Sequence, residues 1–142
     1  MTRKSLRWPL AALVVLFLGI QVIPVDRADP PAGTELRAPD PVMAVLRRAC
    51  YDCHSHETRW PWYSRVAPMA WLMADHVKEG RGDLNFSEWP AFDFEELGEA
   101  GKDIRKQIEK GKMPLRSYLW LHPEARLSEA DREILLDWAR GL

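Results

Sequence analysis

The chain has 142 residues, of which 46% are hydrophobic and 29% are charged. This length allows one compact domain with a modest appendage and excludes a large two-domain enzyme. The 20 lysine and arginine residues nearly balance the 21 aspartate and glutamate residues, which gives a net charge of -1. This balance argues against a protein that binds nucleic acid through a broadly basic surface, so we expect no nucleic-acid partner.

The N-terminal segment has the pattern of a membrane anchor. Arg3, Lys4 and Arg7 precede 18 residues without a charge, from Trp8 to Val25. Such a run is at the lower end of what spans a hydrocarbon core about 30 Å thick, and no cleavage site follows it. We therefore expect residues 1–25 to be a single transmembrane helix in a bacterial inner membrane, with the remaining chain in the periplasm by the positive-inside rule. A cleaved signal peptide and a buried core helix are the alternatives.

Residues 26–40 are expected to form an extended linker. Prolines 30, 31 and 39, Gly33 and scattered charges occur there, and the apolar residues follow no strand or helix period. Proline stiffens such a segment. Residues 41–142 are then expected to form one domain.

Two amphipathic segments predict helices in the first half of this domain. In the first, Asp40 is a suitable N-cap, Pro41 suits the first helical position, and the helix ends at Cys50. Its apolar stripe contains Val42, Val45, Leu46 and Ala49. The second begins near Pro68 and ends near Gly80, with Met69, Leu72, Met73 and His76 on one face.

Two further helices are predicted in the second half. One runs from about Asp93 to Lys110 and stops at Gly111, with Phe94, Leu97, Gly101, Ile104 and Ile108 along its stripe. The other has Ser128 as its N-cap and Asp131 three residues later, and it ends at Gly141. Its inward residues are Ile134, Leu135 and Trp138. No segment alternates as a strand does, so the domain is expected to be all-α.

The chemistry of the sequence is concentrated in Cys50-Tyr51-Asp52-Cys53-His54. This C-x-x-C-H spacing is the attachment signature of c-type haem. Two thiols three positions apart at a helix end can each form a thioether with one vinyl group, and the next histidine is then held beneath the iron. We therefore predict one covalently attached haem c, with Cys50 and Cys53 as attachment residues and His54 as the proximal ligand.

The cysteine pair has three other interpretations. A thiol–disulfide redox pair normally lies between a strand and a helix, and no strand is predicted here. A zinc site with His54, His56 or His76 would make the domain an interaction module, but structural zinc motifs usually contain a second ligand pair, and none follows. The third interpretation is a chance pair without a cofactor, which could form a local disulfide.

Met113 is the predicted sixth ligand of the iron. It lies in a loop between two predicted helices, and Pro114 restricts the backbone so that the thioether can project into a pocket. His76, on the inner face of its helix, is the alternative sixth ligand. His56 is too near His54 to reach the opposite haem face, and His122 is expected to be a loop residue.

Several short motifs resemble the bacterial haem-binding domain family. They are Cys50-Tyr-Asp-Cys-His-Ser-His56, Trp60-Pro-Trp-Tyr-Ser64, Ala67-Pro-Met-Ala-Trp-Leu72, His76-Val-Lys-Glu-Gly-Arg81, Leu84-Asn-Phe-Ser-Glu-Trp89, Met113-Pro114 and Leu121-His-Pro123. The resemblance covers roughly residues 40–140. It implies haem binding and a small helical fold like that of class I cytochromes c.

These observations together predict a membrane-anchored monohaem c-type cytochrome domain that carries single electrons to and from redox partner proteins. An electron carrier needs no open coordination site, so no catalytic residue is expected and the protein is not expected to be an enzyme. The alternative is a haem enzyme or sensor whose sixth position is open or weakly held, so that peroxide or a diatomic gas reaches the iron.

Overall fold

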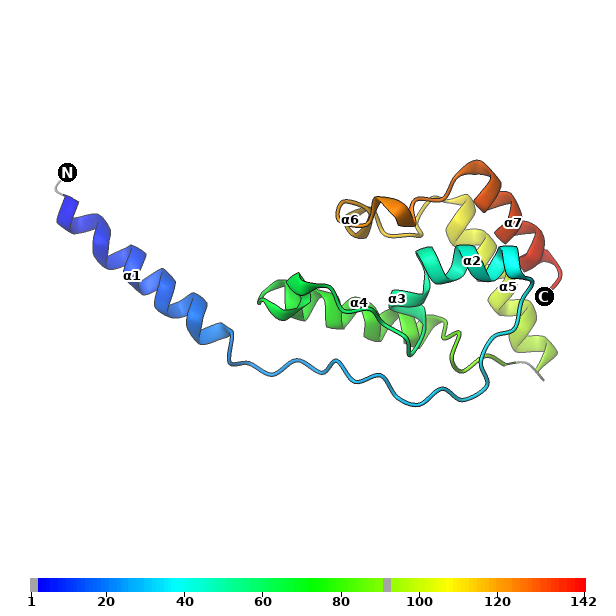
Figure 1. The fold of residues 1–142 in the computed structure, drawn as a ribbon, viewed down its shortest axis with the longest axis horizontal. Helices are drawn as coiled ribbons and strands as arrows, with labels where there is room; N and C mark the ends of the chain where they lie inside the picture. Colours follow the sequence, from blue (N-terminus) through cyan, green and yellow to red (C-terminus); the bar gives the residue numbers. More distant parts are fainter. Residues whose placement is uncertain (1–2, 91–92) are drawn as a thin grey trace. The chain divides into compact units, whose positions relative to one another are not determined.

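The computed structural model describes residues 3–90 and 93–142 of the chain. All regular structure in these ranges is helical, and they contain no strand, so the expected all-α class is confirmed (Figure 1). The α-helices are α1 (Arg3–Ile20), α2 (Asp40–Ala49), α3 (Tyr51–His54), α4 (Met69–Asp83), α5 (Phe94–Glu109), α6 (Arg116–Leu119) and α7 (Glu129–Arg140). Two 3-10 turns, η1 (Trp62–Arg65) and η2 (Pro123–Ala125), complete the set.

The chain divides into two compact units. One contains Met1–Ala28 and Trp60–His76, and the other contains Asp29–Arg59 and Val77–Leu142. Helix α4 therefore contributes residues 69–76 to the first unit and residues 77–83 to the second. The whole C-x-x-C-H motif and Met113 belong to the second unit, whereas His76 belongs to the first.

Helix α1 is shorter than the transmembrane helix expected over residues 1–25. It ends at Ile20, so its uncharged part is the 13 residues from Trp8 to Ile20. At 1.5 Å per residue this part spans about 20 Å, which is less than the hydrocarbon core of about 30 Å. Across residues 3–90 and 93–142 no helix is long and apolar enough to cross a membrane. The predicted anchor, and with it the inner-membrane location with a periplasmic domain, is therefore contradicted.

Within the first unit, the end of α1 is joined to the segment before α4. The side-chain oxygen of Gln21 accepts a hydrogen bond from the backbone N–H of Ala67 at 2.9 Å. The guanidinium of Arg27 donates to the backbone carbonyl of Ser64 at 3.4 Å. Gln21, the polar residue directly after α1, thus pairs with a backbone group of the segment before α4.

The core of the second unit is built by α2, α5 and α7, and α7 packs against each of the other two helices (Figure 1). The predicted stripe of α2 is confirmed, because Val42, Val45, Leu46 and Ala49 are all buried. Gly101, Ile104 and Ile108 of α5 and Leu135 and Ala139 of α7 are buried as well. Phe94, expected on the α5 stripe, is instead 86% exposed, since it is the first residue of the helix and lies beyond the contact with α7.

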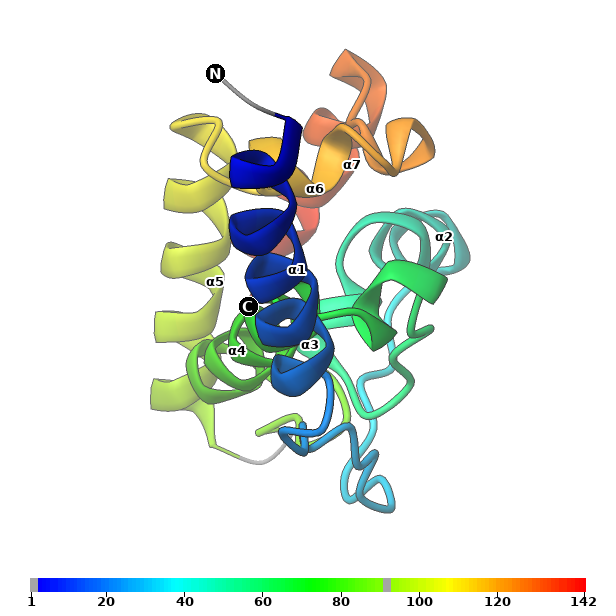
Figure 2. The same cartoon turned by 90° about the vertical axis from the view of Figure 1, so that its left-hand side faces the viewer.

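Sequence signals place the ends of α5 and α7 correctly. The carboxylate of Asp93 accepts from the N–H groups of Glu95 and Glu96, both at 3.0 Å. At α7, Ser128 and Asp131 form a capping box, and Gly141 is the C-cap. Gly111, with φ of 60°, follows the end of α5 in the left-handed conformation that glycine adopts without strain. Figure 2 shows α5 from the side over its full length.

Three predicted helix features are wrong. Pro39, not Asp40, is the N-cap of α2, and Asp40 is its first helical residue. In α4, Met73 of the predicted inner face is buried as expected, but Met69 and Leu72 are 37% and 43% exposed, and the residues buried together with Met73 are Ala70, Val77 and Gly80. The helix also continues past Gly80 to Asp83. Alanine and glycine carry little hydrophobic signal, so the larger Met69 and Leu72 were expected on the inner face instead.

Residues 29–39, part of the expected linker, are packed in the second unit. The Leu36 N–H donates to the Phe86 carbonyl at 2.8 Å, and the Trp89 N–H donates to the Thr34 carbonyl at 2.7 Å. Leu36 is only 3% exposed and belongs to the core. The segment that leads into α2 is therefore held against residues 86–89, which follow α4.

Candidate functional site

Helices α2 and α3 bring Cys50, Cys53 and His54 into one helical turn. The backbone of Cys50 closes α2 by donating to the Leu46 carbonyl at 2.8 Å. Its own carbonyl accepts from the N–H groups of Cys53 at 3.1 Å and His54 at 3.0 Å. The three residues predicted to hold the haem are thus presented together, at a break between two helices.

The ring of His54 is oriented by a backbone carbonyl. Its Nδ1 lies 3.0 Å from the carbonyl oxygen of Leu84, and the Phe86 N–H donates to the His54 carbonyl at 2.7 Å. A carbonyl only accepts, so Nδ1 carries the proton and Nε2 has the free lone pair. Histidines that bind metals usually donate their other ring N–H in this way. The Leu84 carbonyl, which follows α4, therefore leaves Nε2 as the ring atom of His54 that could bind a metal.

The C-terminal part of α4 packs closely on this turn. A Cβ atom at Gly80 would lie 2.7 Å from the carbonyl oxygen of Cys53, so only glycine allows this approach. One residue later, Arg81 donates to the Ser55 carbonyl at 2.9 Å and to the Thr58 hydroxyl at 3.0 Å. Gly80 was predicted as a helix end, but its role is to let α4 touch the motif.

Both cysteines are free thiols in the structure, not the local disulfide considered from the sequence. Burial raises the pKa of Cys50 to about 12 and that of Cys53 to about 11. The neighbouring Asp52 carboxylate also raises the pKa of Cys53. The two sulfur atoms are therefore protonated at neutral pH.

Met113 and His76 occupy different contexts. Met113 follows the turn at Gly111, is half-buried, and its N–H donates to the Gln107 carbonyl at 3.4 Å. His76 is half-buried on α4, in the other unit. The choice between them as sixth ligand therefore stays a prediction.

The other histidines have protein partners. The His56 ring lies 3.3 Å from the Pro31 carbonyl through Nδ1 and 2.9 Å from the Asn85 side-chain nitrogen through Nε2. The His122 Nδ1 is 3.1 Å from the Glu124 carboxylate. His56 therefore joins two other segments of the second unit, whereas the contact of His122 with Glu124 is local to its own loop.

Sequence reasoning missed the role of Asp52, between the two cysteines. Its carboxylate, 12% exposed, accepts from the Tyr118 hydroxyl at 2.7 Å and from Nε of Arg59 at 3.2 Å. Burial, followed by this hydrogen bond, raises the pKa of Tyr118 well above its ordinary value. An aspartate inside C-x-x-C-H and a tyrosine 66 positions later share no local pattern, so no sequence signal pairs them.

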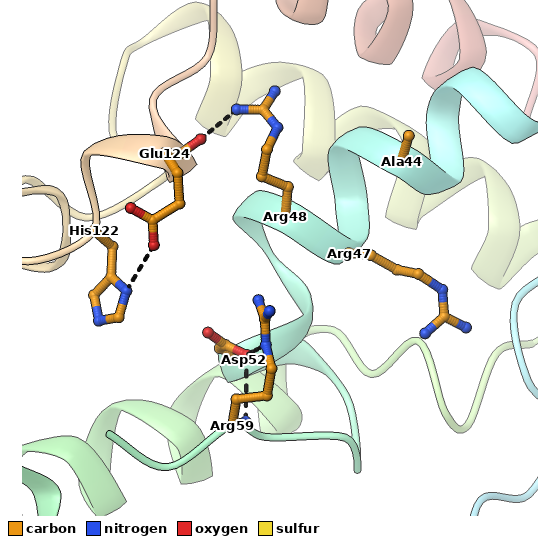
Figure 3. Close-up of a pocket in the computed structure, with 7 residues that line it drawn as sticks. All are labelled: Ala44, Arg47, Arg48, Asp52, Arg59, His122 and Glu124. Atoms are coloured by element: carbon orange, nitrogen blue, oxygen red, sulfur yellow. Dashed lines mark hydrogen bonds and ion pairs between the residues drawn. The ribbon is translucent and has the colours of Figure 1, made fainter. Parts of the chain in front are cut away.

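A cavity of about 440 Å³, lined mostly by charged residues, includes this carboxylate in its wall. It is lined by Ala44, Arg47, Arg48, Asp52, Arg59, His122 and Glu124. Figure 3 shows Asp52 beside Arg59 and His122 beside Glu124, while Arg48 reaches the Glu124 backbone. Arg48 also pairs with Asp131 at 2.8 Å, so the cations at the rim already have acidic partners in the protein.

Comparison with known families decides the identity of the domain. The model of the family described as "Haem-binding domain" matches residues 15–141. The chain belongs to this haem-binding domain family. No curated protein and no solved structure matches the chain. Because the match spans the turn of Cys50, Cys53 and His54, helix α4 and the Met113 loop, haem is the cofactor of this domain.

The arrangement of the motif fits the cofactor of the haem-binding domain family. Two protonated thiols and an imidazole with a free Nε2 share one turn, which is the donor set that haem attachment and ligation need. Over residues 3–90 and 93–142, no group of three or more His, Cys, Asp or Glu side chains could hold a metal ion. The zinc alternative thus gains no support there.

Proposed function

We propose that this haem-binding domain is a monohaem c-type cytochrome domain, with a fold like that of class I cytochromes c, that carries single electrons. The observation that carries the proposal is the His54 ring, whose Nδ1 is held by the Leu84 carbonyl at 3.0 Å in the same turn as the two thiols. The haem iron, when bound, supplies the one-electron couple, and redox partner proteins supply and accept the electron.

Cys50 and Cys53 attach the cofactor in this proposal. Each thiol would add across one vinyl group of the haem, with its sulfur bonded to one vinyl carbon and its hydrogen on the adjacent carbon, so no oxidant would be consumed. The turn fixes the two sulfur atoms three residues apart, and Gly80 keeps α4 against the Cys53 carbonyl behind them. The chain therefore presents both thiols on a rigid backbone.

His54 acts as the proximal ligand through Nε2. The hydrogen bond from Nδ1 to Leu84 fixes the ring orientation and increases the basicity of the ligand atom. Met113 acts as the sixth ligand, from a loop whose start is fixed by the turn at Gly111. With Met113 and His54 both bound, the iron would have a higher reduction potential than with two histidines, and a filled coordination shell would suit electron transfer.

The Met113 assignment is tested with the haem-loaded Met113→Ala and His76→Ala variants. We expect the oxidised wild type to have the long-wavelength sulfur-to-iron charge-transfer band. Met113→Ala should lose this band and shift the potential, while His76→Ala keeps both. If Met113→Ala leaves band and potential unchanged and His76→Ala opens the site, the ligand is His76.

Exogenous ligands separate a carrier from a haem enzyme or sensor. With the sixth position filled, cyanide or carbon monoxide should bind wild type slowly and Met113→Ala rapidly. Rapid binding to the wild type as isolated would contradict the carrier function. It would favour the enzyme or sensor alternative.

A further inference from the structure

Tyr118 connects the segment that follows Met113 to the turn that contains Cys50, Cys53 and His54. This turn is called the attachment turn below. It lies on α6, and its hydroxyl donates to Oδ2 of Asp52 at 2.7 Å, a contact that is partly buried. Asp52 is the residue directly before Cys53. One hydrogen bond therefore joins the backbone near the predicted sixth ligand to the backbone that carries the thiols and His54.

Both partners of this bond are held in place by other contacts. The second oxygen of Asp52, Oδ1, accepts from the Arg59 backbone N–H at 3.3 Å and from Arg59 Nε at 3.2 Å. The Tyr118 ring stacks on the His122 ring, with centroids 4.2 Å apart and planes 10° from parallel. A hydrogen bond to a buried carboxylate is stronger than one between neutral groups.

The segment that contains Met113, residues 112–119, is fixed differently at its two ends. It is called the Met113 segment below. Its start follows α5, which packs on α7. The Lys112 N–H donates a hydrogen bond to the Gln107 carbonyl at 3.0 Å and so ties this start to the end of α5. Its end is α6, a helix of four residues from Arg116 to Leu119, too short to be stable by itself. The position of α6 thus depends on contacts such as the one between Tyr118 and Asp52.

We propose that Tyr118 is a positioning residue for the sixth ligand, because its hydrogen bond to Asp52 holds the Met113 segment at a fixed place relative to the attachment turn. This inference rests on the proposed function, in which Met113 binds the iron. Loss of the bond frees α6 and the preceding loop, so the thioether leaves the iron more often. Asp52 has the complementary role, since it offers the acceptor from within the motif.

The test uses haem-loaded full-length protein and the variants Tyr118→Phe, Asp52→Ala and Asp52→Asn. We expect Tyr118→Phe and Asp52→Ala to bind cyanide about tenfold faster or more, the factor expected from losing a hydrogen bond to a charged group. The sulfur-to-iron band should disappear at a temperature where the helical circular dichroism is unchanged, and backbone amides of residues 112–119 should exchange faster. Asp52→Asn keeps an acceptor oxygen and should restore most of the wild-type behaviour.

Tyr51→Phe is the matched control, since Tyr51 lies in the same motif and its buried hydroxyl has no hydrogen-bond partner within residues 3–90 and 93–142. It should bind cyanide at the wild-type rate. If the wild type has the band and Tyr118→Phe matches it in binding rate and amide exchange, this proposal alone is overturned. A wild type without the band overturns the proposal together with the Met113 assignment.

Discussion

Among single residues, Tyr118 has a pKa that depends on its surroundings. Its hydroxyl is partly buried and donates to a carboxylate, and both features favour the neutral phenol. The pKa in the folded protein is therefore raised above the ordinary value of 10.0. A raised pKa means that the contribution of Tyr118 to stability is complete below pH 10 and decreases above it, where the unfolded chain loses the proton first.

We accordingly predict a pH-dependent difference between the wild type and Tyr118→Phe. The wild type should be the more stable of the two by a constant amount from pH 7 to about pH 9, and this advantage should shrink as the pH rises above about 10. Urea unfolding at several pH values measures it. A difference in unfolding free energy that is the same at pH 7 and pH 11 would show that the phenol has an ordinary pKa in the folded state.

At the level of helices, the contact between α5 and α7 depends on the absence of a side chain at Gly101. A Cβ atom there would lie 2.6 Å from the Ala139 carbonyl oxygen and 3.1 Å from Cβ of Leu142. The same carbonyl accepts a hydrogen bond from Arg105 at 2.6 Å. The obstacle is backbone, which cannot turn aside as a flexible side chain can, so the helices would have to separate.

Gly101→Ala should therefore lower the free energy of unfolding by about 1–3 kcal/mol, despite the better helix propensity of alanine. Gly98→Ala on the same helix is the control, because a Cβ there would meet no heavy atom of the described residues within 4 Å, apart from its chain neighbours and the backbone of its own helix. It should raise the free energy of unfolding by about 0.5–1 kcal/mol. Thermal unfolding of both variants measures these changes in stability. Equal effects at the two positions would mean that the close approach at Gly101 is not a feature of the protein in solution.

How well a helix was predicted depends on where its signal resides. The ends of α5 and α7 follow from Asp93, Ser128 and Gly141, because caps act within three or four residues along the chain. The burial of Gly80 on α4 could not be predicted, since the Cys53 carbonyl that covers it lies far away along the chain. Likewise, C-x-x-C-H predicted Cys50, Cys53 and His54 as a set, but not Leu84 or Tyr118, which only the fold brings to them.

At the scale of the whole molecule, the boundary of the folded region begins earlier than the proline content suggests. The segment containing Leu36 was expected to be a linker, yet its backbone pairs with residues 86–89 and its leucine is buried in the core. Prolines 30, 31 and 39 exclude helix there but do not exclude packing of an extended chain. By contrast, the uncharged stretch of residues 8–25 predicted a longer helix than the chain forms, because α1 ends at Ile20.

Leu36→Ala should cost about 2–5 kcal/mol of unfolding free energy, as expected for a leucine removed from a core. Leu121→Ala, at a position that is 59% exposed, is the control and should change the value by less than about 0.5 kcal/mol. Chemical denaturation followed by circular dichroism measures both. A Leu36→Ala protein as stable as the wild type would place residues 29–39 outside the cooperative domain.

Covalent attachment of one haem at the turn of Cys50, Cys53 and His54 is the central claim. Intact mass spectrometry of the unfolded protein, after maturation in a host that attaches haem, tests it most directly. We expect a chain heavier by one haem, with the added mass on the peptide containing residues 50–54 and absent from the Cys50→Ala/Cys53→Ala variant. Haem that separates from the chain on unfolding, leaving the mass of the polypeptide alone, would contradict it.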